Sequence, residues 1–137
     1  MSVNKGFTLT ELLIAVAIVA ITASVAYPSY VEYVQDGRRS QAQQQMLEMA
    51  GVIERIYSRN SGYPDASLLT DLPESKFYTF KYIPTDKPNG AVGQYRNLGY
   101  QFTATPIVGK AQATDKCGEL SINHLGEQGP KNNDCWQ

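Results

Sequence analysis

The sequence predicts an α+β fold in which one long N-terminal α-helix packs on an antiparallel β-sheet. Three observations predict it. A nearly continuous apolar run at the N-terminus leads directly into an amphipathic stretch with helical periodicity. The C-terminal half contains three short segments rich in aromatic and β-branched residues, and turns with Gly and Pro separate them. The length of 137 residues is enough for one such domain.

The chain is not strongly basic. Lys and Arg number 12, Asp and Glu number 13, and the formal net charge is −1. No overall basic field therefore attracts nucleic acid. Lys110, Lys116 and Lys131 form at most a small basic patch that could touch DNA, and the nearby acids favour an ordinary surface instead.

The apolar run from Phe7 to Ala26 matches a membrane span, because 20 helical residues reach about 30 Å. Lys5 is the only basic residue before Arg38, so the positive-inside rule places the short N-terminus in the cytoplasm and the rest of the chain outside it. The residues that follow supply an aromatic belt where the helix would leave the bilayer: Tyr27, Tyr30 and Tyr33.

Two cleavage sites are compatible with this run. An ordinary secretory signal would be cut after Ala26, which would free a secreted periplasmic binding domain beginning at Tyr27. The alternative cut lies between Gly6 and Phe7 and keeps the helix. Glu11 favours the second site, because a carboxylate costs about 2.5–3.5 kcal/mol near the centre of a membrane helix and less near its end, and a disposable signal gains nothing from that cost. A capping box from Thr8 to Glu11 is a secondary benefit.

The stretch Lys5-Gly6-Phe7-Thr8-Leu9-Thr10-Glu11-Leu12 resembles the prepilin signature of type IV pilins. The resemblance implies a ladle or lollipop fold, removal of residues 1–6 by a prepilin peptidase, and methylation of the new amine on Phe7. It also implies that Glu11 neutralises the amine of a neighbouring subunit during assembly; a carboxylate one helical turn into the helix could equally pair with the amine of its own chain. Ala20 departs from the pattern, because many members have glycine there, so local melting of the helix in a filament is less expected.

The expected organisation is a leader over 1–6, a transmembrane and assembly half of the helix over 7–33, and a globular head over 34–137. Pro28 should kink the helix without ending it. The amphipathic half shows one apolar face over 41–58, and Arg38-Arg39 is interpreted as a solvated face. The helix should stop in the cluster Asn60-Ser61-Gly62-Tyr63-Pro64.

The head should then contain a three-stranded β-meander. The segment 77–83 is the first predicted strand and is bounded by Pro84. Tyr95 to Thr105 is the second, with one inward face made of Leu98, Tyr100, Phe102 and Ala104. Gly118 to Asn123 is the third, with Leu120 and Ile122 inward. A short helical turn is expected at 67–72.

The two cysteines, Cys117 and Cys135, predict a disulfide, because the head is expected outside the cytosol. Free or metal-binding thiols are the alternative, but the spacing fits no zinc pattern. Closing this loop would stabilise a small head by about 3 kcal/mol. The region from Cys117 to Trp136 also resembles the disulfide-bounded end of pilins, in particular short-tailed minor pilins of the PilE kind.

No catalytic motif, metal site or cofactor site is predicted. His124 is interpreted as a turn or surface histidine. Asp115 and Asp134 could suggest calcium, but Ca²⁺ takes six to eight oxygens and the sequence has no dense acidic run. The sequence therefore predicts no enzyme.

The sequence as a whole predicts a structural subunit, a type IV pilin-like protein of the minor kind. It would be anchored in the inner membrane and then assembled with other pilins, major and minor, into an extracellular filament for twitching motility, adhesion or DNA uptake. A type II secretion pseudopilin or a major pilin is the alternative within the same machinery. The periplasmic binding domain is the alternative from a different class.

Overall fold

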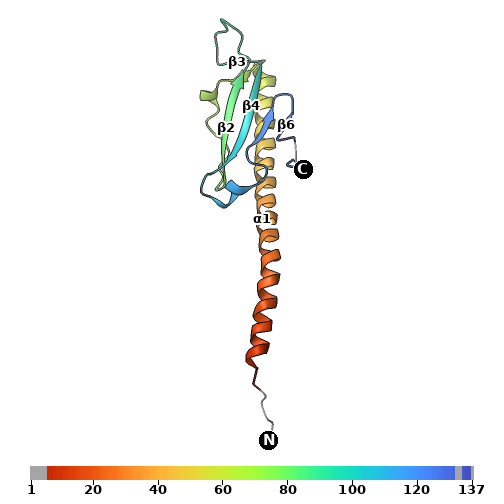
Figure 1. Cartoon of the computed structure of the whole chain (residues 1–137). Coiled ribbons are helices and arrows are strands. Elements are labelled where there is room, and N and C mark those ends of the chain that lie inside the picture. The colour runs from red at the N-terminus through yellow and green to blue at the C-terminus, as the bar shows by residue number, and fades with distance from the viewer. Residues whose placement is uncertain (1–5, 132–133, 137) are drawn as a thin grey trace. The chain divides into compact units, whose positions relative to one another are not determined.

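The computed structural model describes residues 6–131 and 134–136. The chain divides into two compact units between Val34 and Gln35, and each is described by itself. Helix α1, Leu9–Asn60, contributes to both units (Figure 1). It begins at Leu9, directly after Thr8, as the predicted capping box requires, and it ends at the predicted stop cluster, where Ser61 adopts a positive φ of 58°.

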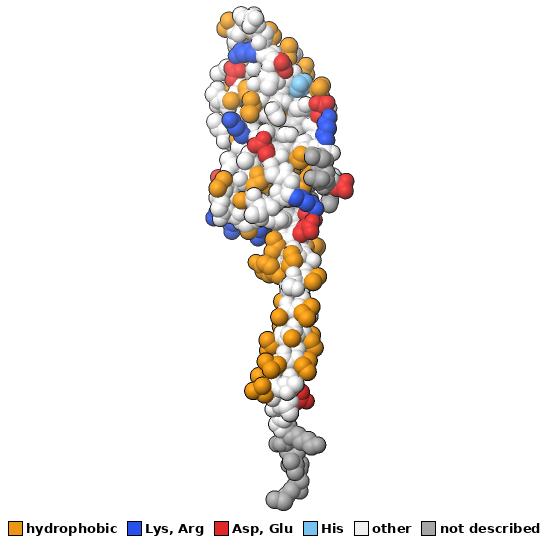
Figure 2. Space-filling view, in the orientation of Figure 1, with side chains coloured by type: hydrophobic (Ala, Val, Ile, Leu, Met, Phe, Trp, Pro, Cys, Tyr) orange, Lys and Arg blue, Asp and Glu red, His pale blue; other side chains and the backbone are white. Residues whose placement is uncertain are grey.

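The first unit is the apolar half of α1. Every residue from Gly6 to Tyr30 is exposed, and apolar side chains crowd over this segment (Figure 2). By length and composition, α1 contains a stretch able to cross a membrane. Pro28 lies inside the helix, which continues on both sides of it. The predicted kink at Pro28 remains a prediction.

The second unit is the head, in which the second half of α1 lies along one face of a β-sheet (Figure 1). The buried helix residues recur at spacings of three and four, which is the periodicity of one helix face. They include both polar and apolar side chains: Gln35, Arg39, Ala42, Gln43, Met46, Met49, Ala50 and Ile53.

The main sheet has four antiparallel strands in the order β2-β4-β5-β6. Their bounds are Tyr78–Thr85, Gly99–Pro106, Leu120–Asn123 and Gln128–Gly129. The predicted meander is thus confirmed, and β6 is a strand that the prediction missed. Strand β2 also runs through Pro84, which was expected to end it. Because β2 is an edge strand, the missing N–H of Pro84 can face away from the ladder.

The second predicted strand was wrong as one continuous element. It breaks into β3, Tyr95–Asn97, and β4, and β3 pairs with the short strand β1, Tyr63–Pro64, in a separate two-stranded sheet. Leu98 lies at the break and is 56% exposed, so it does not share the inward face of Tyr100, Phe102 and Ala104.

The core of the head lies between α1 and the inner face of the main sheet. Phe102 and Leu120 from the sheet and Met46 and Ile53 from the helix are fully buried. Two 3₁₀ helices complete the head: η1, Ala66–Leu68, and η2, Ala111–Thr114. The predicted helical turn at 67–72 overlaps η1, which begins one residue earlier.

Candidate functional sites

The N-terminal motif places Glu11 in a reciprocal capping box with Thr8. Glu11 Oε2 accepts hydrogen bonds from Thr8 N (2.8 Å) and Thr8 Oγ1 (2.7 Å), and Thr8 Oγ1 in turn accepts from Glu11 N (3.2 Å). This pairing satisfies donors that a helix start leaves free. Gly6 and Phe7 precede the helix and are exposed, with 93% of Phe7 accessible.

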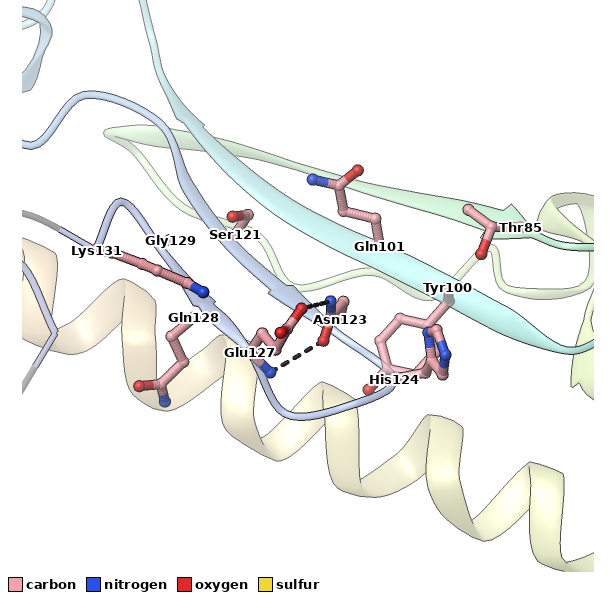
Figure 3. Close-up of a pocket in the computed structure, with 10 residues that line it drawn as sticks. All are labelled: Thr85, Tyr100, Gln101, Ser121, Asn123, His124, Glu127, Gln128, Gly129 and Lys131. Atoms are coloured by element: carbon pink, nitrogen blue, oxygen red, sulfur yellow. Dashed lines mark hydrogen bonds between the residues drawn. The ribbon is translucent and has the colours of Figure 1, made fainter.

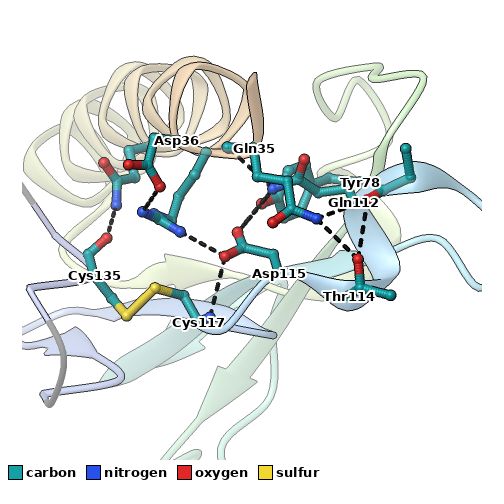
Figure 4. Close-up of polar contacts among 11 residues, drawn as sticks. Gln35, Asp36, Tyr78, Gln112, Thr114, Asp115, Cys117 and Cys135 are labelled. Atoms are coloured by element: carbon teal, nitrogen blue, oxygen red, sulfur yellow. Dashed lines mark hydrogen bonds and ion pairs between the residues drawn. A yellow bond between two sulfur atoms is a disulfide. The ribbon is translucent and has the colours of Figure 1, made fainter. Parts of the chain in front are cut away.

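The two cysteines form the predicted disulfide, Cys117–Cys135, next to a buried polar cluster at the start of the head (Figure 4). The centre of this cluster is an ion pair in which Arg39 Nη1 lies 2.6 Å from Asp115 Oδ1. Arg39 also pairs with Asp36. The side chains of Arg39 and Asp115 are only 5% and 1% exposed, so each charge needs the other.

Asp115 accepts further hydrogen bonds from strand β2, from η2 and from the turn that follows η2. Its oxygens receive Cys117 N at 3.2 Å, Gln112 Nε2 at 2.8 Å and Tyr78 Oη at 3.3 Å. Burial, and then the Asp115 carboxylate, raise the pKa of Tyr78 to about 12, because both disfavour a phenolate. The cluster ties α1, β2, η2 and the disulfide together.

The interpretation of Arg38-Arg39 as a solvated face was wrong. Arg39 is buried, and the guanidinium of Arg38 stacks on Phe77, with 3.9 Å between Arg38 Cζ and the ring centroid. Helical spacing could have identified Arg39, because it lies three and seven residues before the buried Ala42 and Met46. No spacing in the sequence identifies Asp115 as its partner, since 76 residues separate them.

The two residues considered for calcium lie in different surroundings. The Asp115 carboxylate is paired with Arg39 and hydrogen-bonded to its other partners, whereas Asp134 is exposed. Among residues 6–131 and 134–136, no group of three or more His, Cys, Asp or Glu side chains is arranged to hold a metal ion.

A pocket of about 330 Å³ lies beside strands β4, β5 and β6 (Figure 3). Most of its lining residues carry an amide, hydroxyl or charged group: Thr85, Tyr100, Gln101, Ser121, Asn123, His124, Glu127, Gln128, Gly129 and Lys131. The Glu127 carboxylate accepts a hydrogen bond from Asn123 Nδ2 at 2.8 Å. Such a lining offers hydrogen-bond donors to a polar ligand.

His124 is held by close packing in this pocket wall. It is half-buried, and its Nδ1 has no hydrogen-bond partner among the described residues. A Cβ added at Gly99 would lie 2.7 Å from the imidazole, so any other residue there would have to displace the side chains of His124 and Thr85. These contacts place His124 as a packing residue of the turn after β5.

The three lysines considered for DNA do not all lie on one element. Lys110 and Lys116 flank η2, whereas Lys131 follows β6 and lines the pocket. All three are exposed.

Comparison with known proteins identifies the class. Residues 28–121 match the family described as "Type IV minor pilin ComP, DNA uptake sequence receptor", and residues 1–27 match the "Prokaryotic N-terminal methylation motif". A type IV pilin from Shewanella oneidensis is 35% identical, with a TM-score of 0.60, over 75% of this chain and 98% of that one. The non-core minor pilin PilV of Neisseria meningitidis shares the fold: 16% identity, a TM-score of 0.50, and coverage of 76% and 95% of the two chains. Among curated proteins nothing matches significantly.

The fold, a long N-terminal helix packed on an antiparallel sheet behind a methylation motif, is that of the type IV pilins. Within them, the chain belongs to the type IV minor pilin family of ComP. It is therefore a structural pilus protein that assembles with other pilins.

Proposed function

We propose that the chain is made as a prepilin and matures by a cut between Gly6 and Phe7. A prepilin peptidase removes residues 1–6 and methylates the amine of Phe7. Until assembly the chain spans the inner membrane once, with its N-terminus in the cytoplasm. The observation that carries this proposal is the match of residues 1–27 to the methylation motif, together with the exposure of Gly6 and Phe7 ahead of α1.

Glu11 would then set the axial register of the filament. Its Oε2 is used by the capping box, while no hydrogen bond to its Oε1 occurs within the described part of the chain. An oxygen left over from capping can pair with the Phe7 amine of a neighbouring subunit. A charged amine packed among apolar helices needs such a partner, because a buried unpaired charge is strongly unfavourable.

Two substitutions separate the charge of Glu11 from its capping role. Glu11→Gln keeps an acceptor for Thr8 but removes the charge, so we expect methylated chain to accumulate in the membrane and to be lost from sheared pili. Thr8→Ala weakens the cap by about 1 kcal/mol but keeps the charge, so we expect it in sheared pili. The measurement is the amount of each variant in pili and in membranes of a strain that makes the major pilin.

The register role is wrong if Glu11→Gln enters pili as well as the parent chain does. Mass spectrometry of the mature N-terminus tests the processing step independently. N-methyl-Phe7 is the expected result, whereas an unmodified Tyr27 would support an ordinary signal peptide.

DNA binding by the head is a second candidate function. It is supported by the description of the matching family, which names a DNA uptake sequence receptor. The exposed Lys110, Lys116 and Lys131 can neutralise phosphates, and Lys131 borders a pocket whose amides and hydroxyls can donate to a nucleic acid.

The triple variant Lys110→Gln, Lys116→Gln and Lys131→Gln tests this second function. We expect weaker binding of labelled duplex DNA to the full chain in detergent. The slope of log affinity against log salt should also fall by about 0.9 for each lysine that contacts a phosphate. Arg59→Gln, at the far end of α1, is the matched control. Equal affinity and slope in the triple variant and the parent would exclude these lysines as the contact.

A further inference from the structure

One end of the head carries an exposed surface that is both basic and apolar. We call it the basal patch and define it by Arg38, Lys76, Val108 and Lys110. Val108 is 92% exposed, Lys76 and Lys110 are exposed, and Arg38 is half-exposed. Figure 2 shows Lys and Arg side chains gathered along the lower edge of the head.

Strand pairing and backbone hydrogen bonds place these residues at one end of the main sheet. Strand β2 begins where β4 ends, because Tyr78 pairs with Pro106. Ile107 N donates to Phe77 O at 2.9 Å, and Lys110 N donates to Ile107 O at 3.2 Å, so the turn that holds Val108 adjoins the segment after Lys76. Arg38 joins them by stacking on Phe77.

The exposed acids beside the basal patch are fewer than its cations. Asp36 and Asp115 are both paired with Arg39. Glu119 is exposed and accepts a hydrogen bond from Thr105, and Glu74, two residues before Lys76, is a second exposed acid. The three cations of the patch, of which Arg38 is half-exposed, therefore lie beside two exposed acids, Glu74 and Glu119, and an exposed valine.

The chain enters the head at this same end. Gln35, the first residue of the head, donates to Ala111 O (3.0 Å) and to Thr114 Oγ1 (2.9 Å), so the chain enters the head beside η2 and the turn of Val108. Gln35 is joined directly to Val34, the last residue of the apolar unit. The patch thus lies on the end of the head from which the membrane segment continues.

We propose that the basal patch docks the head on a bilayer of anionic lipids while the chain is anchored in the membrane. Lys76, Lys110 and Arg38 pair with lipid phosphates, and Val108 enters the boundary between headgroups and acyl chains. Each Lys or Arg close to such a surface raises the ratio of docked to free head about five-fold. Assembly into a pilus must release this contact.

The test uses the full chain with its disulfide intact, one chain per lipid nanodisc. A polarity-sensitive fluorophore is attached to Val108→Cys or, as a matched control, to Val92→Cys. Val92 is 87% exposed and lies in the loop after β2, at the opposite end of the sheet. Quenching of each label by brominated lipids is compared between phosphatidylcholine discs and discs that also contain phosphatidylglycerol.

We expect quenching at position 108 to rise with phosphatidylglycerol and quenching at position 92 to stay the same. Lys76→Gln and Lys110→Gln should each lower the docked-to-free ratio at position 108 about five-fold. Equal quenching in the two lipid compositions, or at the two positions, overturns the proposal. So does a label at 108 that responds only to added duplex DNA, which would make the patch a nucleic-acid site, or only when discs hold several chains, which would make it a subunit contact.

Discussion

Arg39 is a charged side chain that the fold buries. It lies on the core face of α1 and reaches Asp115, which in turn holds Tyr78, Gln112 and the backbone of Cys117. Such a pair contributes little compared with well-packed apolar residues, yet removal of one partner is costly because the other charge stays buried. The Arg39–Asp115 ion pair instead fixes the positions at which η2 and the disulfide pack against α1.

Arg39→Met should therefore destabilise the head by about 3–5 kcal/mol, because Asp115 loses its cation. The double variant Arg39→Met with Asp115→Asn should lose less, because no buried charge remains. Urea unfolding of the full chain in detergent, followed by circular dichroism, gives these free energies.

Arg38→Met is the control for that comparison. Arg38 is half-exposed and stacks on Phe77, so its loss should cost about 1 kcal/mol or less. Equal costs at positions 38 and 39 would show that the ion pair does not carry the stability assigned to it.

At the scale of elements, the break between β3 and β4 decides which leucine belongs to the core. Leu98 lies at the break and is 56% exposed, whereas Leu120 in β5 is fully buried. Alternation in the sequence predicts both to face inward. Because β3 pairs with β1 instead of continuing into the main sheet, only Leu120 does.

Leu120→Ala should cost about 2–5 kcal/mol of unfolding free energy, through lost apolar burial and the cavity left behind. Leu98→Ala should stay within about 0.5 kcal/mol of the parent chain. Both variants remove the same atoms, so the difference in their urea midpoints reports burial alone. A large loss of unfolding free energy for Leu98→Ala would support the predicted single strand from Tyr95 to Thr105 instead.

At the scale of the whole molecule, the two units differ in how their apolar side chains are covered. The first unit exposes apolar side chains along its length, and these require lipid or neighbouring helices to cover them. The head encloses its own small core and closes its C-terminal segment with a disulfide. Gln43 donates to the carbonyl of Cys135, and Trp136 Nε1 donates to Gly129 O at 2.7 Å, so the segment is also held by hydrogen bonds.

Replacing both cysteines, Cys117→Ser with Cys135→Ser, should lower the stability of the head by about 3 kcal/mol, because the unfolded chain regains the freedom of the open loop. Reductant should lower the stability of the parent chain by a similar amount and leave the double variant unchanged. Near-ultraviolet circular dichroism during unfolding distinguishes these cases. If reductant leaves the stability of the parent chain unchanged, the disulfide has no stabilising role.

Much of the fold could be predicted because it depends on local signals. The apolar run, the stop cluster at Asn60 to Pro64, and the alternation around Phe102 and Ile122 each lie within a few residues of the element they define. The strand β6 could not be predicted, because two residues, Gln128 and Gly129, carry no periodicity and are strands only through pairing with β5. The polar cluster could not be predicted either, since Arg39 and Asp115 meet only after the sheet has formed.

The sequence by itself determined that this chain has a pilin-type N-terminus, a membrane-length apolar helix, a helix-on-meander head and a disulfide at its C-terminal end. Each of these follows from residue type and spacing, which set local conformation and hydrophobic pattern. The tertiary structure alone decided that Arg39 is buried against Asp115, that Leu98 leaves the core, and that Arg38, Lys76, Val108 and Lys110 share one end of the head. Those placements depend on contacts between residues far apart in the chain, and such contacts exist only once α1 and the strands have packed.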